Sequence, residues 1–331
     1  MSKISTFITR GDNIESVHGI KCIVLNKKKE ILLSTNNNKD LIFPRSSIKI
    51  FQALPFILSG ASKKYNLNSR QVALACSSHT GENFHLADLK NWLEKLKIKM
   101  NKLKCGIHNP INLVSSDRLL LSGNKPDQLH NNCSGKHLAM LSSCLVNNYN
   151  LNNYLETNHP HQKKIRDILE LYMNKKINKK NYSVDGCSAP QYAFELKDLS
   201  EGLINLISSY NNKFAFNYEI KFLINNILNN PMMIGGKKRF DSELIKICNR
   251  KLFCKGGAEG VFLFAHLKKE IAGVIKVIDG NERAVPSAVA AILKKLKITS
   301  QEENYNLKIW LNSFIYNHAK TITGKIFTKI N

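Results

Sequence analysis

The chain has 331 residues, with 49 Lys and Arg against 25 Asp and Glu, which gives a formal net charge of +24. Its hydrophobic content of 43% is ordinary for a globular enzyme, and the chain is long enough to bury a large core in one or two domains. No apolar run approaches the ~18–20 residues of a membrane span, and residues 1–6 lack the apolar core of a secretory signal. We therefore expect a cytoplasmic protein that binds no membrane and keeps its eight cysteines reduced.

The positive charge could indicate a nucleic-acid partner. However, Lys and Asn are enriched together, as in residues 174–181, without aromatic residues interleaved for stacking on bases. AT-rich coding produces this mixture without selection for binding, so we do not expect a nucleic-acid partner. A zinc-dependent basic nucleic-acid-binding protein is the alternative from a different functional class, and it would need the basic residues on one contiguous face.

In chain order, the apolar and β-branched runs 19–25 and 30–34 predict a hairpin. Helical spacing begins near residue 46, where Pro55 should kink or end the helix, and returns at 88–96, 136–141, 163–173 and 221–228. Strands are predicted again at 252–255, 261–265 and 271–278, followed by a helix over 282–296. This order predicts an α+β fold in one domain, residues 1–331, with sheet segments at about 17–35 and 251–280 and a helical region at about 46–235.

The first candidate site is Ser46 with Lys49, at the start of the first helical pattern. Serine commonly caps a helix, and a helix that begins at Ser46 places Lys49 one turn later on the same face. A neutral lysine can take the proton of a serine hydroxyl, so the spacing suits a Ser–Lys nucleophile. Alone the motif is weak, because a capped helix with a solvated lysine has the same pattern.

Four further stretches are rich in residues that carry chemistry, at 76–82, 130–137, 185–190 and 255–260. In the last, Lys255-Gly256-Gly257 follows a strand-like run and resembles the Lys-Thr-Gly motif that accompanies Ser-x-x-Lys in β-lactamases and penicillin-binding proteins. Glycines there let a substrate approach a strand edge closely. A second cation beside Lys49 would favour the neutral form of its amine.

Seven segments, in the same order, resemble the rhizobial-type asparaginases of the Asparaginase II family; they lie at 44–55, 78–82, 130–137, 185–190, 233–241, 255–260 and 279–284. The resemblance implies the serine β-lactamase-like fold, with an antiparallel sheet from the N- and C-terminal segments flanked by helices. It also implies hydrolysis of L-asparagine to aspartate and ammonia by a homodimer. One departure is Ser188, where the family frequently has glycine.

The resemblance assigns two catalytic pairs, Ser46 with Lys49 and Ser78 with Lys255. We expect Ser46 to attack the side-chain carboxamide and Lys49 to take its proton, while Ser78 and Lys255 relay protons to the departing ammonia. Which serine attacks stays open. A glutaminase or a D-Ala-type peptidase on the same fold is the nearest rival, and the presence of all four Ser and Lys residues argues against a decayed paralogue.

The resemblance also implies about one zinc ion per chain, held by Cys133, Lys136 and Cys187. From the residues alone, His137 would be chosen in place of Lys136, because Cys133 and His137 are i and i+4 on a helix. Lysine is a rare ligand, since its amine must lose a proton to offer a lone pair. Packed thiols without a metal are the alternative.

The predicted substrate-binding residues are Arg45, His79, Glu82, Asp185 and Arg283. His79 and Glu82 could serve as a base and a carboxylate, but we expect them to hold their loop by hydrogen bonds. Each of the two arginines could grip the α-carboxylate of an amino-acid substrate by a bidentate contact, and the sequence does not separate them.

Overall fold

The computed structural model describes residues 2–35 and 39–331. The chain forms two compact units. Unit 1 contains Met1–Ser47, Phe194–Ser208 and Leu244–Asn331, and unit 2 contains Ile48–Ala193 and Ser209–Glu243. The single domain predicted for the whole chain stays a prediction.

Unit 1 is built around an antiparallel sheet that has eight strands within the described residues, in the order β6-β7-β8-β2-β1-β10-β9, with β3 paired to β2. The strands are β1 (Ile4–Arg10), β2 (Asn13–Asn26), β3 (Ile31–Ser34), β6 (Leu252–Gly257), β7 (Val261–His266), β8 (Ile271–Val277), β9 (Asn312–Tyr316) and β10 (Ile322–Ile330). The predicted sheet from N- and C-terminal segments is confirmed.

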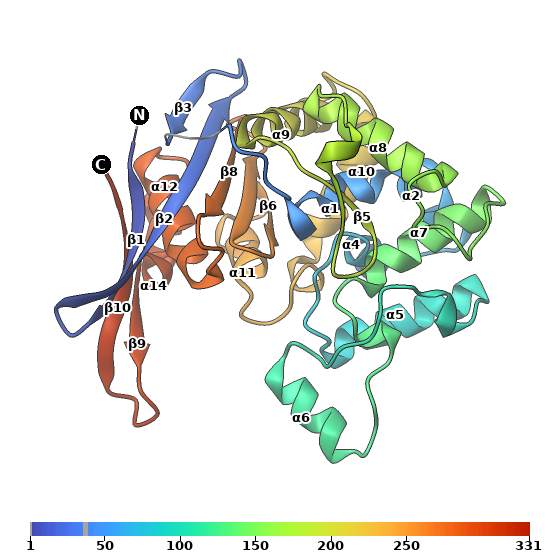
Figure 1. Ribbon diagram of the computed structural model, residues 1–331, viewed down its shortest axis with the longest axis horizontal. Coiled ribbons are helices and arrows are strands. Elements are labelled where there is room, and N and C mark those ends of the chain that lie inside the picture. Colours follow the sequence, from blue (N-terminus) through green and yellow to red (C-terminus); the bar gives the residue numbers. More distant parts are fainter. Residues whose placement is uncertain (1, 36–38) are drawn as a thin grey trace. The chain divides into compact units, whose positions relative to one another are not determined.

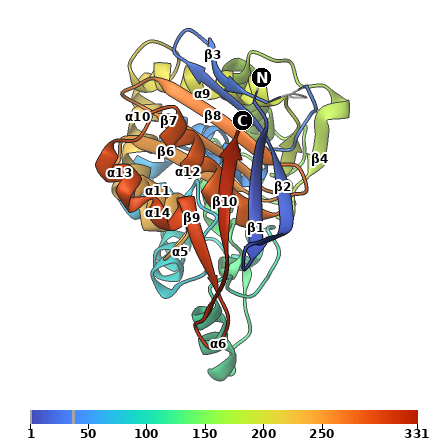
Figure 2. The ribbon, with the colours of Figure 1, turned by 90° about the vertical axis from the view of Figure 1, so that its left-hand side faces the viewer.

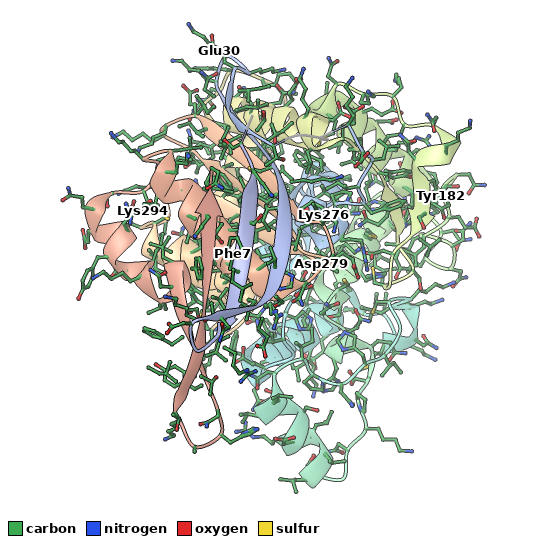
Figure 3. The ribbon with its side chains drawn as sticks, turned by 60° about the vertical axis from the view of Figure 1, so that its left-hand side comes forward. Phe7, Glu30, Tyr182, Lys276, Asp279 and Lys294 are labelled. Carbon is green, nitrogen blue, oxygen red and sulfur yellow. The ribbon has the colours of Figure 1, made fainter. Side chains whose placement is uncertain are left out.

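Three strands of this sheet were not predicted, namely β1, β9 and β10. Strand β1 pairs with β10 from Ile4 opposite Ile330 to Ile8 opposite Ile326, so the two ends of the chain run side by side (Figure 1). On this pair Phe7, labelled in Figure 3, stacks on Phe327 with ring centroids 5.4 Å apart. Burial alternates over residues 4–8 of β1, where Ile4, Thr6 and Ile8 are buried, as expected for a strand with one face in the core.

Helices of unit 1 cover this sheet. Helix α12 (Val285–Lys295) packs against β1, β7, β8 and β10 (Figure 2) and is followed by α13 (Gln301–Asn306) and α14 (Lys308–Leu311). The predicted helix over 282–296 is thereby confirmed, with a 3₁₀ turn Glu282–Ala284 at its start. Helix α9 (Leu196–Tyr210) begins in unit 1, where the Ser200 hydroxyl donates to the Ile23 carbonyl at 3.1 Å.

Unit 2 is mostly helical, as predicted for the middle of the chain. Its helices are α1 (Lys49–Gln52), α2 (Leu54–Leu58), α3 (Ala61–Lys64), α4 (Ser69–Leu74), α5 (Asn83–Leu96), α6 (Leu113–Leu121), α7 (Ser134–Val146), α8 (Pro160–Met173) and α10 (Asn217–Asn229). Strands β4 (Tyr182–Val184) and β5 (Pro190–Tyr192) form a small hairpin, and α11 (Phe240–Ile247) leads out of the unit. The break between α1 and α2 confirms the interruption predicted near Pro55.

Helix α7 is the core helix of unit 2. It packs against α2, α3, α4, α5 and α8, and its residues from Ser134 to Cys144 are all buried. A helix that is small or apolar on every side can be enclosed in this way. Gly135 is required at its contact with α4, because an added Cβ would lie 2.2 Å from the Leu74 carbonyl oxygen.

The helix start predicted at Ser46 is wrong in its detail. Arg45–Ile48 form a 3₁₀ turn, the α-helix begins at Lys49, and no side chain caps it. The turn is set by Arg45, whose φ is +54°, and by Ser47, whose backbone N–H and hydroxyl both donate to the Pro44 carbonyl. A 3₁₀ turn therefore stands where the sequence predicted the first turn of an α-helix capped by Ser46. No helix of the described residues has the length and apolar character to span a bilayer.

Candidate active site

Lys49 and Ser78 meet in the interior of unit 2. Lys49 is the first residue of α1, and its fully buried amine donates to the Ser78 hydroxyl at 3.0 Å. The same amine donates to the Ser77 carbonyl and, at 3.2 Å, to the Cys133 sulfur. Ser78 follows α4, and its backbone N–H donates to the Ile234 carbonyl at 2.8 Å, which fixes its position. These bonds bring a lysine amine and a serine hydroxyl together in a buried setting, as Ser–Lys chemistry requires.

Ser46 and Lys255 belong to unit 1, so each predicted catalytic pair has one member in each unit. Within unit 1, the end of β6 packs against the turn that carries Ser46. A Cβ on Gly257 would lie 2.5 Å from the Pro44 carbonyl oxygen and 3.2 Å from the Ser47 nitrogen. Lys255, two residues earlier on β6, is 2% exposed, and its amine donates to the Gly256 carbonyl at 2.9 Å. The close approach explains why glycine stands at residue 257.

The loop from Ser78 to Glu82 is held by the two residues for which a structural role was expected. Gly81 donates its backbone N–H to His79 Nδ1 at 3.2 Å, so Nε2 carries the proton and donates to the Ser134 hydroxyl at 2.9 Å. Burial, with the neighbouring His85 and Lys49, holds the pKa of His79 well below its usual value, so the ring is neutral.

On the far side of the loop, Glu82 Oε2 accepts hydrogen bonds from the Thr80 hydroxyl and from the Lys237 backbone N–H, both at 2.9 Å. Gly236 lies against this carboxylate, since a Cβ there would be 2.5 Å from Glu82 Oε2. Together His79 and Glu82 tie the Ser78 loop to α7 and to the turn after residue 234. They therefore fix the position of Ser78.

A cluster of two thiols, an amine and a carboxylate adjoins Lys49. Cys133 stands at the N-terminus of α7, Lys136 lies in its first turn, and Cys187 is in the turn between β4 and β5. The Lys136 amine lies 3.0 Å from the Cys187 sulfur, and Asp185 Oδ2 lies 3.9 Å from the same sulfur. All three of Cys133, Lys136 and Cys187 are buried.

The neighbours of each group in this cluster shift the pKa values of the two cysteines in opposite directions. The hydrogen bond between the two thiols, with the charge of Lys136, lowers the pKa of Cys187, while the same bond and burial raise the pKa of Cys133. Although burial alone would lower it, the pKa of Lys136 is raised by the charges of the two cysteines and of Asp185. Both shifts favour a thiolate at Cys187 and an ammonium at Lys136.

The donor set fits a zinc ion of mixed sulfur and nitrogen ligation, provided that Lys136 loses its proton on binding. His137, the alternative ligand, is engaged through Nδ1, which lies 2.6 Å from the Tyr154 hydroxyl. Cys133 is the N-cap residue of α7, and its carbonyl accepts the His137 backbone N–H at 3.1 Å, so the two residues do stand one helical turn apart. Across residues 2–35 and 39–331, no group of three or more His, Cys, Asp or Glu residues forms a metal site. Any ligation here thus depends on the lysine.

Arg283, one of the two arginines expected at the substrate, is engaged inside unit 1. Its Nε donates to His18 Nε2 at 3.1 Å, and its Nη2 donates to the Ser16 hydroxyl at 2.7 Å. His18 Nδ1 in turn lies 2.6 Å from Asp279 Oδ2, at the turn after β8 (Figure 3). Arg45 is half-buried on the turn before α1. Of the two arginines, Arg45 is adjacent in sequence to a predicted catalytic residue.

Sequence reasoning missed three residues of these networks: His18, Ser134 and Ser77. His18 is a polar residue that faces inward on a strand, and its 3% exposure could have been suspected from the alternation of β2. The Ser134 hydroxyl bonds both His79 Nε2 and the Leu129 carbonyl, and no local sequence pattern predicts these two hydrogen bonds.

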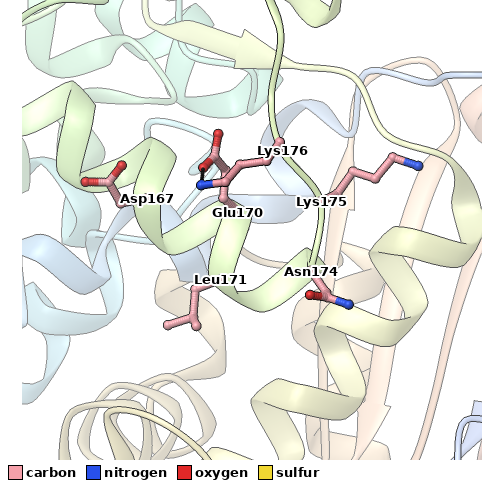
Figure 4. A pocket seen from close by; sticks show the side chains of 6 residues that line it. All are labelled: Asp167, Glu170, Leu171, Asn174, Lys175 and Lys176. Atoms are coloured by element: carbon pink, nitrogen blue, oxygen red, sulfur yellow. Dashed lines mark hydrogen bonds and ion pairs between the residues drawn. The ribbon is translucent and has the colours of Figure 1, made fainter.

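The predicted site residues do not coincide with the cavity of about 380 Å³ near the end of α8 (Figure 4). Asp167, Glu170, Lys175 and Lys176 line it. Two of these charges form an ion pair, between Glu170 and Lys176 at 2.7 Å, and Glu170 also accepts a hydrogen bond from the Ile177 backbone N–H. We find no chemistry in it that Ser–Lys catalysis would use.

The sequence profile of the L-asparaginase II family matches residues 7–328 of the chain. None of the curated proteins compared with the chain matches it. Among solved structures, a beta-lactamase from Mycobacterium bovis is similar, with 9% identity and a TM-score of 0.41 over 84% of this chain and 94% of that chain. A putative beta-lactamase from Bacteroides dorei has 9% identity and a TM-score of 0.37 over 88% of this chain and 93% of that chain.

Proposed function

Because the chain belongs to the L-asparaginase II family, we propose that this asparaginase-type amidohydrolase acts on L-asparagine and releases aspartate and ammonia through a Ser–Lys acyl-enzyme. The observation that carries the mechanism is the buried contact of 3.0 Å between the Lys49 amine and the Ser78 hydroxyl, beside the turn that holds Ser46 in the chain. An amine in that place is suited to accept and return a serine proton.

In the proposed reaction, the Ser46 oxygen forms a bond to the side-chain carboxamide carbon while Lys49 takes the hydroxyl proton. The carbon–nitrogen bond then breaks, and Ser78 with Lys255 delivers a proton to the departing ammonia. Water attacks the resulting ester, and aspartate leaves as the serine regains its proton. Apart from that of Ser47, which donates to the Pro44 carbonyl, the backbone N–H groups of the 3₁₀ turn at Arg45–Ile48 are candidates to stabilise the oxyanion.

The contact between Lys49 and Ser78 supports a second assignment of the nucleophile. Ser78 would attack, and Lys49, which already donates to its hydroxyl, would accept its proton. The two versions differ in which single substitution abolishes acyl transfer, so they are separable by experiment.

We also propose that Cys133, Lys136 and Cys187 hold about one zinc ion per chain, with Asp185 beside them. When bound, zinc would hold both sulfurs as thiolates. The proposed metal site would lie beside Lys49, because the Cys133 sulfur also contacts the Lys49 amine and so joins α7 to α1. Since the Ser–Lys pair supplies the nucleophile, we assign the metal site to substrate placement and not to the activation of water.

The partner and location predictions complete this proposal. We propose a cytoplasmic homodimer with a small-molecule substrate. We do not propose a nucleic-acid partner despite the net charge of +24. A glutaminase is the nearest alternative, and its substrate is longer than asparagine by one methylene group.

The test is ammonia release by the purified chain from L-asparagine, L-glutamine and D-asparagine, measured in parallel. We expect the highest kcat/KM with L-asparagine. Higher kcat/KM with L-glutamine would establish the glutaminase alternative. Release from none of the three would contradict the proposal.

A further inference from the structure

Unit 2 contains a cavity of about 520 Å³ that lies apart from the Ser–Lys pair and the thiol cluster. It is formed by the start of α5, the first half of α6 and the turn after residue 235 (Figure 1 shows α5 and α6). Its lining includes Glu82, Phe84, Val114, Arg118, Lys237 and Lys238. Of the residues predicted for catalysis, substrate or metal, only Glu82 is among them. The volume is in the range of small-molecule sites.

The cavity is surrounded by positive charge that the protein does not neutralise. Arg118, Lys237 and Lys238 are exposed, and no ion pair of theirs is found among residues 2–35 and 39–331. Glu82 is the acidic residue of the lining, and it is 6% exposed. Its Oε2 is already bound by the Thr80 hydroxyl and the Lys237 backbone N–H, so it faces its own loop. Three cations in one cavity repel one another unless an anion joins them.

The walls between these cations are apolar. Phe84 and Val114 both line the cavity, and Val114 is 66% exposed. A free anion such as phosphate would leave this apolar surface in water. A zwitterion such as aspartate would bring its own ammonium group among the three cations. A dianionic head attached to an apolar or aromatic body satisfies both parts of the lining.

We propose that this cavity is a binding site for a small phosphate monoester whose organic part is apolar or aromatic, such as a nucleoside monophosphate. A phosphate monoester carries about −1.5 to −2 charge at pH 7, which suits three cations beside one carboxylate that is already hydrogen-bonded. Arg118 and Lys238 grip the phosphate, and Phe84 and Val114 contact the organic part.

The cavity borders the loop that carries Ser78. The Asn112 backbone N–H donates to the Thr80 carbonyl at 2.9 Å, and the Thr80 N–H donates to the Gly235 carbonyl at 2.9 Å. The three segments that form the cavity are therefore joined through this loop. A ligand that contacts all three stabilises the folded chain by mass action.

The proposal is tested by isothermal titration calorimetry of the full chain with adenosine monophosphate, adenosine, inorganic phosphate and L-aspartate. We expect adenosine monophosphate to bind at one site per chain, and each of the other three to bind at least about tenfold more weakly. The double variant Arg118→Gln, Lys238→Gln should lose at least about tenfold in affinity. Its melting temperature without ligand checks that it is folded.

The matched control is Lys125→Gln, which removes one exposed lysine that does not line the cavity. It should bind adenosine monophosphate as the wild type does. Equal loss in the control and the double variant would mean that the net charge of the chain attracts the anion, and would overturn the site. Equal affinity for inorganic phosphate and adenosine monophosphate would overturn the proposed class of ligand. Absence of binding to the folded wild type would overturn the proposal altogether.

Discussion

Replacing Gly257 by alanine should displace the turn that carries Ser46 and lower turnover while unit 1 stays folded. The new Cβ would lie 2.5 Å from the Pro44 carbonyl oxygen, where ordinary van der Waals contact begins at 3.4 Å. The obstructing atom belongs to the backbone, so it cannot rotate away, and the turn or β6 must shift by about 0.9 Å. Overpacking of this kind costs about 1–3 kcal/mol of stability.

A displacement of about 1 Å in a reacting group can lower a rate by about 10²-fold. We therefore expect Gly257→Ala to lower the kcat for ammonia release by about one to two orders of magnitude, since Ser46 shares the displaced turn. Circular dichroism and the melting temperature establish that the variant is folded.

The matched control is Gly19→Ala on β2, in the same unit. Its Cβ would lie 2.8 Å from Ile278 Cδ1, the flexible end of an exposed side chain that can turn aside. The control should keep wild-type turnover. If folded Gly257→Ala also keeps turnover within about twofold, the position of the Ser46 turn does not limit the reaction, and the reasoning is refuted.

Three further predictions concern Lys49, the metal and acid stability. Lys49→Arg keeps a charge but cannot lose its proton near pH 7, so ammonia release should fall as far as in Lys49→Ala; substantial activity would make the residue a structural cation. Metal analysis of the wild type should find about one zinc per chain. Cys187→Ser should lose this zinc and keep some turnover, whereas the control Cys248→Ser, whose thiol lies in unit 1, should keep it. Absence of zinc from the wild type would contradict the metal site. Burial lowers the pKa of His161 from 6.5 to about 3, so only the unfolded chain binds this proton between those values, and stability is lost as pH falls. Neither ring nitrogen of His161 has a hydrogen-bond partner, so His161→Leu breaks no side-chain bond. In urea melts, the free energy of unfolding of the wild type should fall between pH 6.5 and 4.5 by about 2–3 kcal/mol more than that of the variant. An equal fall in both would show that His161 does not contribute.

The elements that the sequence predicted best are those with a clear local pattern. The hairpin of β2 and β3 lies where its apolar and β-branched runs predicted it, and helices α5, α7, α8 and α10 lie where helical spacing predicted them. Strands β1 and β10 have no such pattern, and their pairing joins residues more than 300 positions apart, such as Thr6 with Thr328. Local patterns do not specify a partner at that separation, and β9 depends on β10 for its place.

The site shows the same division between local and distant information. The spacing of Ser46 and Lys49 led to a helix that begins at Ser46, whereas the left-handed backbone of Arg45 produces a 3₁₀ turn. The contact of Lys49 with Ser78 depends on how α1 packs beside the end of α4, which spacing does not reveal. In the thiol cluster, the resemblance to a family indicated Lys136, and residue-level reasoning preferred His137. In the structure the Lys136 amine lies 3.0 Å from the Cys187 sulfur, whereas His137 Nδ1 lies 2.6 Å from the Tyr154 hydroxyl, and spacing alone does not reveal these contacts.

The central claim, an acyl-enzyme formed on a serine, is tested most directly by partition of the acyl group between water and hydroxylamine. The amounts of aspartate and aspartyl hydroxamate are measured with L-asparagine and with L-aspartate β-methyl ester as substrates. If both substrates pass through one acyl-enzyme, the account predicts the same ratio of the two products, and it predicts that Ser46→Ala, though folded, forms neither at an appreciable rate. A ratio that differs between the substrates, or turnover of L-asparagine with no hydroxamate, would contradict it.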